Sequence, residues 1–180
     1  GLILPDGDAK VVDSISDAYT ACGIADDKKL PEEKDAGKAL YFNYAANAPT
    51  TYSYTTAEYT VKAGDCLKLS FWVKAEVRYP TERALTVTLN DLGNGVSEDH
   101  IVKTTIADNV NTKDYENDNY NGWCEYIVYV NNTSDLEGKE TDRKFTLTFD
   151  FGITSISDYN NNTWNLTSGY AIIAGFDGYV

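Results

Sequence analysis

Strict alternation of apolar and polar residues recurs along most of this 180-residue chain and limits its fold more than any other feature. In the stretch "CLKLSFWVKAE", Leu67, Leu69, Phe71 and Val73 alternate with Lys68, Ser70 and Lys74 on the opposite, polar face. A period of two places successive side chains on opposite faces of an extended strand, so the pattern predicts a half-buried β-strand. Trp72 departs from the pattern, because it is a large apolar residue among lysines. Either another part of the fold covers it, or it is open to a ligand.

The same alternation predicts strands in seven further segments. These are "KALYFNYA", "TYSYTTAEYTV", "ALTVTLND", "DHIVKTTIA", "WCEYIVYVN", "RKFTLTFDFG" and "GYAIIAGFDGYV". The second is expected to contain a twist or bulge, and the last is apolar enough for a central strand covered on both faces. Turn-forming segments rich in Gly, Asn and Asp lie between them. About eight strands with little helix predict an all-β fold, namely an antiparallel β-sandwich with a jelly roll as the leading topology.

A chain of this length is expected to form a single domain over residues 1–180. Residues 1–36 are the less certain part. "AKVVDSI" is compatible with a strand, whereas "SDAYTACG" indicates a short helix, because Ile15, Tyr19 and Cys22 share a helical face and a glycine follows. The chain contains no Met, which suggests a domain excised from a larger protein.

The charge of the chain excludes several classes of partner. With 15 basic and 28 acidic residues, the formal net charge is −13. Such a surface repels nucleic acid and anionic membranes, and no apolar run is long enough for membrane insertion. The same carboxylates can serve as ligands for a hard cation such as calcium.

The sequence does not favour an enzyme. His100 is the one histidine, so a multi-histidine metal site is excluded, and no nucleophile elbow, phosphate-binding loop or metalloprotease helix occurs. Cys22, Cys66 and Cys124 are widely spaced and form no zinc motif. We expect reduced thiols packed as small hydrophobic residues, with one disulfide and one leftover thiol as the alternative.

Five segments, in order, carry a resemblance to a known family. They are "GKALYFNY", "YTVKAGDCLKLSFWVKAE", "NGWCEYIVYVN", "FTLTFDFG" and "SGYAIIAGFDGYV". Over residues 37–180 the chain resembles the galactose-binding-like jelly-roll domains that occur as carbohydrate-binding modules in secreted bacterial glycosidases and surface proteins. The resemblance implies an extracellular or cell-surface location and an accessory, non-catalytic role. The family's opening Asn-Gly-x-Phe-Glu strand is not present in "GLILPDGDAK".

The resemblance also implies a structural calcium ion near the chain termini. Asp177 in "AGFDGYV" matches the family's metal-binding aspartate of the final strand, and Asp6 and Asp8 are candidate partners. An unpaired carboxylate in an apolar strand is costly, so a cation would stabilise it. The alternative is that backbone N–H groups of the terminal turn satisfy Asp177.

Carbohydrate recognition requires aromatic rings on which the C–H face of a sugar can stack, with polar groups beside them. Family members bind glycans either on a sheet face or among edge loops. Trp72 and Tyr41 would serve the sheet face, whereas Trp164, Tyr159 and Tyr120 would serve the loops. If the N-terminal segment or a loop covers Trp72, the loop residues are the remaining candidates.

The leading interpretation is therefore a non-catalytic module of a secreted or surface bacterial protein that recognises carbohydrate by aromatic stacking. The alternative is a structural or adhesion spacer domain without a sugar ligand. We expect a monomer whose partners are a polysaccharide or glycan and the neighbouring domains of the parent chain. Trp123, which follows a glycine at the start of its strand, is expected to pack structurally.

Overall fold

The structure of the chain is a computed structural model. It describes ten stretches of the sequence, and all structural statements below concern these residues. They are residues 10–24, 37–45, 51–77, 85–93, 102–110, 113–114, 119–120, 122–132, 142–152 and 168–179.

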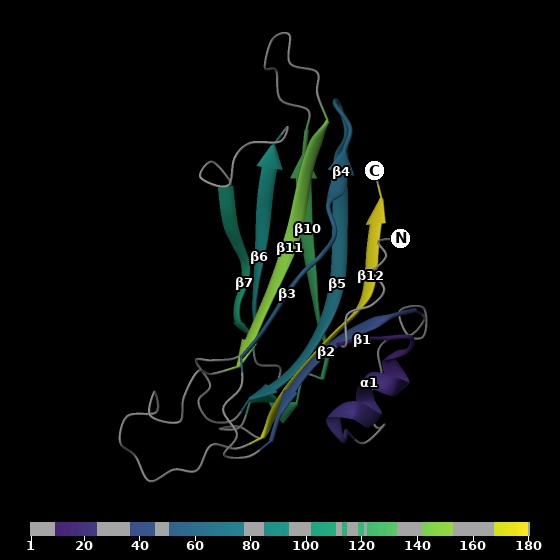
Figure 1. The fold of residues 1–180 in the computed structure, drawn as a ribbon, viewed down its shortest axis with the longest axis vertical. Coiled ribbons are helices and arrows are strands. Elements are labelled where there is room, and N and C mark those ends of the chain that lie inside the picture. The colour runs from purple at the N-terminus through teal and green to yellow at the C-terminus, as the bar shows by residue number, and fades with distance from the viewer. Residues whose placement is uncertain are drawn as a thin grey trace, which may run out of the picture.

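Sheet A contains five antiparallel strands in the order β1–β2–β12–β5–β10 (Figure 1). Their bounds are Val11–Val12 for β1, Ala39–Tyr44 for β2, Gly169–Tyr179 for β12, Cys66–Val77 for β5 and Cys124–Asn131 for β10. The apolar C-terminal strand β12 lies between β2 and β5. Its central position, predicted from its continuous apolar run, is confirmed.

Sheet B is also antiparallel and follows the order β3–β11–β6–β7, with β4 pairing the same side of β11 as β3. The bounds are Thr51–Thr55 for β3, Tyr59–Val61 for β4, Arg143–Gly152 for β11, Leu85–Gly93 for β6 and Val102–Val110 for β7. The expected irregularity in "TYSYTTAEYTV" is thus a break between two short strands. A separate two-stranded ribbon joins β8, Lys113–Asp114, to β9, Asn119–Tyr120.

The order of pairing defines the topology. Along the chain the principal strands pair from the outside inward: β2 with β12, β3 with β11, β5 with β10, and β6 with β7. This nested pairing, distributed over two packed antiparallel sheets, is a jelly roll. The predicted all-β sandwich is therefore confirmed.

The space between the sheets is filled by the inward positions of the alternating strands. Leu67, Leu69, Phe71 and Val73 of β5 are all buried there, as their spacing predicted. Phe71 stacks on Phe176 of β12, with ring centroids 5.7 Å apart. Buried aliphatic and aromatic side chains of this kind supply most of the stabilisation of a sandwich.

Candidate functional site

The outer face of sheet A is divided into two parts. Helix α1, Ile15–Cys22, packs over one part, which we call the covered half (Figure 1). Its sheet and edge residues are Ala39, Tyr41, Trp72, Lys74, Trp123, Tyr170, Ile172 and Ala174. The remaining part, which we call the open half, consists of Lys68, Ile127, Tyr129, Asn131 and Asp177, with the buried Ser70 between them. Cross-strand pairs place both sets on the same face.

Helix α1 forms where its sequence predicts it. The Ser14 side chain accepts a hydrogen bond from the Asp17 backbone N–H at 3.1 Å and caps the first turn. Gly23 adopts the left-handed conformation that ends the helix, with φ 66°. Ile15 and Tyr19 are buried against sheet A, so the helix adds a second, smaller hydrophobic cluster outside the sandwich core.

Trp72 lies in this second cluster. It points outward from β5, as its position in the alternation requires, opposite Ala174 of β12 and Glu125 of β10. The N-terminal helix packs against the cluster and leaves Trp72 partly buried. Its indole nitrogen Nε1 is buried and has no acceptor within hydrogen-bonding distance among the described residues. Trp72 therefore packs with the cluster that α1 joins and is partly buried, which is closer to the covered alternative than to an open ring.

Tyr41 is also in contact with the N-terminal segment. Its backbone N–H donates to the carbonyl of Lys10 at 3.0 Å, which brings the N-terminal segment onto β2. The Lys10 ammonium group then lies 5.3 Å from the centroid of the Tyr41 ring and 4.6 Å from that of Tyr52. Since a cation already interacts with this ring, Tyr41 does not offer the open platform that the sequence suggested.

Two further interactions attach α1 to the sheet. Trp123 Nε1 donates to the hydroxyl of Tyr19 at 3.2 Å, and the two rings meet edge to face with centroids 6.3 Å apart. Asn43 Nδ2 donates to the carbonyl of Ala21 at 3.1 Å. Trp123 thus packs structurally, as expected, but beneath the helix and outside the inter-sheet core.

Lys74 is buried, although its position in the alternation predicted a polar, outward face. The alternation placed it on a polar outward face together with Lys68. It does point to the outer face, opposite Ile172, but its exposed fraction is 0%. The outward face of β5 is therefore polar and partly exposed at Lys68 and buried at Lys74. A period-two pattern identifies the face of a strand but not what covers that face.

The open half presents two apolar side chains to solvent. On β10, Tyr129 is 64% exposed and Ile127 is 46% exposed. Tyr129 pairs with Lys68 of β5, and Ile127 pairs with Ser70. Tyr129 was not among the residues predicted from the sequence to bind a ligand. It lies four residues after Glu125, the partner of Trp72, so the alternation along β10 already indicated that its ring faces outward.

Asp177, the predicted calcium ligand, lies beside this patch. A bulge at Gly175, with φ 62°, shifts the register so that Asp177 pairs with Ser70 on the outer face. Asp177 already has an interaction partner in this structure. Among the described residues, no group of three or more His, Cys, Asp or Glu side chains is arranged to hold a metal ion. Asp6 and Asp8 lie outside the described residues.

The predicted loop aromatics cannot be placed in the same way. Trp164 and Tyr159 lie outside the described residues, as does His100. Tyr120 belongs to β9, where its backbone pairs with Lys113, but its side chain is not among those described.

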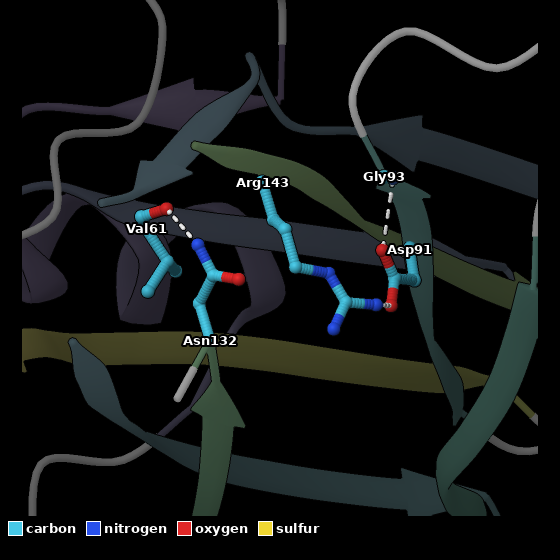
Figure 2. A network of polar contacts seen from close by, with 5 residues as sticks. All are labelled: Val61, Asp91, Gly93, Asn132 and Arg143. Carbon is cyan, nitrogen blue, oxygen red and sulfur yellow. Dashed lines mark hydrogen bonds and ion pairs between the residues drawn. The ribbon is translucent and has the colours of Figure 1, made fainter. Parts of the chain in front are cut away.

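A polar network closes one end of the sandwich, where β6, β10 and β11 begin or end (Figure 2). Arg143 forms an ion pair with Asp91, whose other oxygen accepts a hydrogen bond from the Gly93 N–H at 2.9 Å. Asn132 Nδ2 donates to the carbonyl of Val61 at 3.0 Å. These contacts fix strand ends to one another, and their arrangement indicates a structural role.

All three cysteines are free thiols, as in the first of the two expectations, but Cys124 is exposed and does not pack as a small hydrophobic residue. Cys22 lies at the end of α1, where burial raises the pKa of its thiol to about 12 while the charge of Lys10 partly opposes that rise. Cys124 is exposed on β10. No helix among the described residues is long and apolar enough to cross a membrane.

Comparison with known proteins does not assign the chain to a family. No family model and no curated protein matches it. Among solved structures, the chain is similar to the crystal structure of the infectious bursal disease virus VP2 subviral particle, with 8% sequence identity and a TM-score of 0.35. The match covers 84% of this chain and 36% of the viral chain, so this chain spans little more than a third of that protein.

Proposed function

We propose that this domain is a non-catalytic module that binds carbohydrate on the open half of sheet A. The exposure of Tyr129 is the observation that carries the proposal. A ring that is 64% exposed on a paired β-strand is held at the surface by the sheet backbone, so it requires little ordering when a ligand binds. The apolar C–H face of a sugar would stack on such a ring.

The polar neighbours of Tyr129 support this proposal. Lys68 pairs with it across the sheet and supplies N–H donors. Asn131 is exposed on the same face of β10 and supplies both donors and acceptors. Asp177 lies farther off, on β12 beyond β5 and in the row of Ser70 and Ile127, and supplies carboxylate acceptors for an adjoining sugar unit. Lys68 and Asn131 can hydrogen-bond hydroxyls of the sugar ring stacked on Tyr129.

The loop residues Trp164, Tyr159 and Tyr120 form a second candidate location for the same function. The proposed domain is thus an extracellular or surface module of a bacterial protein that binds a glycan on the face of sheet A. The loop aromatics either extend this binding surface or form the binding site instead of it. A structural calcium ion at Asp177 belongs to the same proposal. If it is bound, a chelator should lower the thermal midpoint of the wild type but not that of Asp177→Asn.

A spacer or adhesion domain without a sugar ligand is the second candidate function. The packing of the covered half favours it, because Trp72 and Tyr41 are used to attach the N-terminal segment. Under this interpretation the exposed ring of Tyr129 is an ordinary surface residue.

Affinity electrophoresis through a panel of polysaccharides tests the proposal. We expect the wild type to be retarded by at least one polysaccharide, and Tyr129→Ala to lose at least about tenfold in affinity, or about 1.4 kcal/mol. Tyr129→Phe should retain binding because it keeps the ring. Trp72→Phe serves as the covered control and should bind like the wild type.

The other outcomes are equally informative. If Trp164→Ala abolishes retardation while Tyr129→Ala does not, the site lies in the loops. If the wild type is not retarded by any polysaccharide, glycan binding is wrong and the spacer function remains.

A further inference from the structure

The two sheets of the sandwich end in four edges. Sheet A ends at β1 and β10, and sheet B ends at β7 and at the pair β3 and β4. An edge strand presents unpaired backbone N–H and C=O groups, which can pair with a strand of another chain. Natural proteins protect such edges with short strands, interruptions, bulges or charges, so an unprotected edge points to a partner.

Three of the four edges carry this protection. Strand β1 is only two residues long. The edge formed by β3 and β4 is broken between Thr55 and Tyr59. Strand β7 has two register shifts against β6 and carries the exposed charged residues Lys103 and Asp108. None of the three offers a long, regular template.

Strand β10 lacks all of these features. It is eight residues long and pairs with β5 without a register shift, from Cys124 to Asn131. Its one charged residue is Glu125, and the run from Tyr126 to Val130 is wholly apolar. No described strand pairs with its other side. Regular pairing, apolar sequence and a single charge make β10 the one edge of this sandwich suited to strand addition.

In place of the monomer expected from the sequence, we propose that β10 pairs antiparallel with β10 of a second copy of this chain, around a two-fold axis at Val128. In this register Ile127 faces Tyr129 of the partner, and Tyr126 faces Val130 of the partner. The remaining pair sets Glu125 against Asn131 of the partner, so no two like charges are opposed. A self-complementary strand of this kind meets the requirement of an isologous interface.

The same contacts explain why a second copy fits better than an unrelated peptide. Aromatic side chains meet β-branched ones at both outward and inward positions, and such cross-strand pairs stabilise a sheet. The inward side chains of Tyr126 and Val130 are only partly buried at the present edge. A paired copy would cover them further, and the two five-stranded sheets would become one continuous sheet.

Dimerisation would also enlarge the open half. Ile127 and Tyr129 of both copies would form one patch around the axis, with two tyrosine rings where a single copy has one. This consequence rests on the proposed glycan function, whereas the pairing itself does not. Sedimentation velocity without glycan measures the dimer and affinity electrophoresis measures glycan binding, so a loss of one can be observed separately from a loss of the other.

Sedimentation velocity over a concentration series tests the proposal. We expect the wild type to form a dimer with increasing concentration, and more so at high salt, because each copy carries a net charge of −13. Ile127→Lys should weaken the dimer at least tenfold, since it puts cations beside the axis. The matched control is Val102→Lys on edge strand β7, where Val102 is 62% exposed, and it should dimerise like the wild type.

A disulfide test fixes the register independently. In a Cys66→Ser, Cys124→Ser background, which removes the thiol that pairs with position 131 on β5, Glu125→Cys combined with Asn131→Cys should give a covalent dimer under oxidising conditions. The two positions are roughly 20 Å apart along one strand and cannot bond within one copy. A wild type that stays monomeric, a dimer that Ile127→Lys leaves intact, or failure of this pair to cross-link would each overturn the proposal.

Discussion

At Gly169 the packing of one neighbour determines which residue the position accepts. Gly169 of β12 pairs with Tyr44 of β2, and the Tyr44 ring lies directly over it. A Cβ atom at position 169 would lie 2.6 Å from the Cζ atom of that ring. A buried aromatic ring packed over a glycine on the adjacent strand leaves no room for even a methyl group.

We therefore expect Gly169→Ala to lower the free energy of unfolding by about 1–3 kcal/mol, because the Tyr44 ring must shift within a packed core. Urea denaturation measures the change. The exposed neighbour Ser168→Ala provides the control and should leave the midpoint unchanged. Equal midpoints for Gly169→Ala and the wild type would show that the ring does not lie where the structure places it.

Cys22 gives a prediction about pH. Burial raises the pKa of its thiol in the folded protein to about 12, whereas an unfolded chain ionises near 8.5. The stability that comes from the neutral buried thiol is fully present below about pH 8.5 and is lost as the pH rises toward the folded pKa. We expect the free energy of unfolding to fall between about pH 8.5 and 10 in reductant, and to fall less in Cys22→Ala.

Urea denaturation at a series of pH values provides the measurement for Cys22. The exposed Cys124→Ala is the control and should follow the wild type. Burial also raises the pKa of Tyr59 and Tyr126, and both tyrosines cancel between the wild type and Cys22→Ala; the charge of Cys124 adds to the rise at Tyr126, so that small part changes in Cys124→Ala. Identical pH profiles for Cys22→Ala and the wild type would contradict the burial of this thiol at the end of α1.

At the scale of single elements, α1 is a short helix attached to the outer face of sheet A. It has eight residues, and an isolated helix of that length is not stable in water. Its stability depends on the small cluster beneath it and on the bonds from Trp123 and Asn43. We infer that α1 opens locally before the sandwich unfolds.

Ser14→Ala should loosen α1 selectively. Loss of the N-cap hydrogen bond should cost the helix about 1 kcal/mol. Amide hydrogen exchange should accelerate over α1 several-fold while the amides of β5 and β12 remain protected. Ser16→Ala, at an exposed position inside the same helix, is the control. Equal acceleration in α1 and β5 would mean that the helix and the sandwich open as one unit.

The strands and the helix could be predicted from the sequence because each depends on a local pattern of residues. Alternation identified the principal strands, and the spacing of Ile15 and Tyr19 with the glycine stop identified α1. The covering of Trp72 and the burial of Lys74 were not accessible, because they depend on where α1 packs. The outward direction of Tyr129 could be predicted from the alternation along β10. Its exposure could not, because that depends on β10 lying at the edge of the sheet.

At the scale of the whole molecule, the nested pairing of strands accounts for the location of both proposed surfaces. It brings β12 to the centre of sheet A, where α1 covers one part of the outer face, and it leaves β10 at the edge. The open half and the pairing edge therefore meet on the same strand. The sandwich was predictable from composition and alternation, whereas this juxtaposition required the strand order.

The division of the outer face of sheet A into covered and open halves is the central claim, and hydroxyl-radical footprinting with mass spectrometry tests it most directly. At low protein concentration we expect rapid modification of Tyr129 and at least several-fold slower modification of Trp72 and Tyr41, even though free tryptophan is at least as reactive as tyrosine. Ser14→Ala should raise the rate at Trp72 and leave the rate at Tyr129 unchanged. Modification of Trp72 as fast as that of Tyr129 in the wild type would contradict the claim.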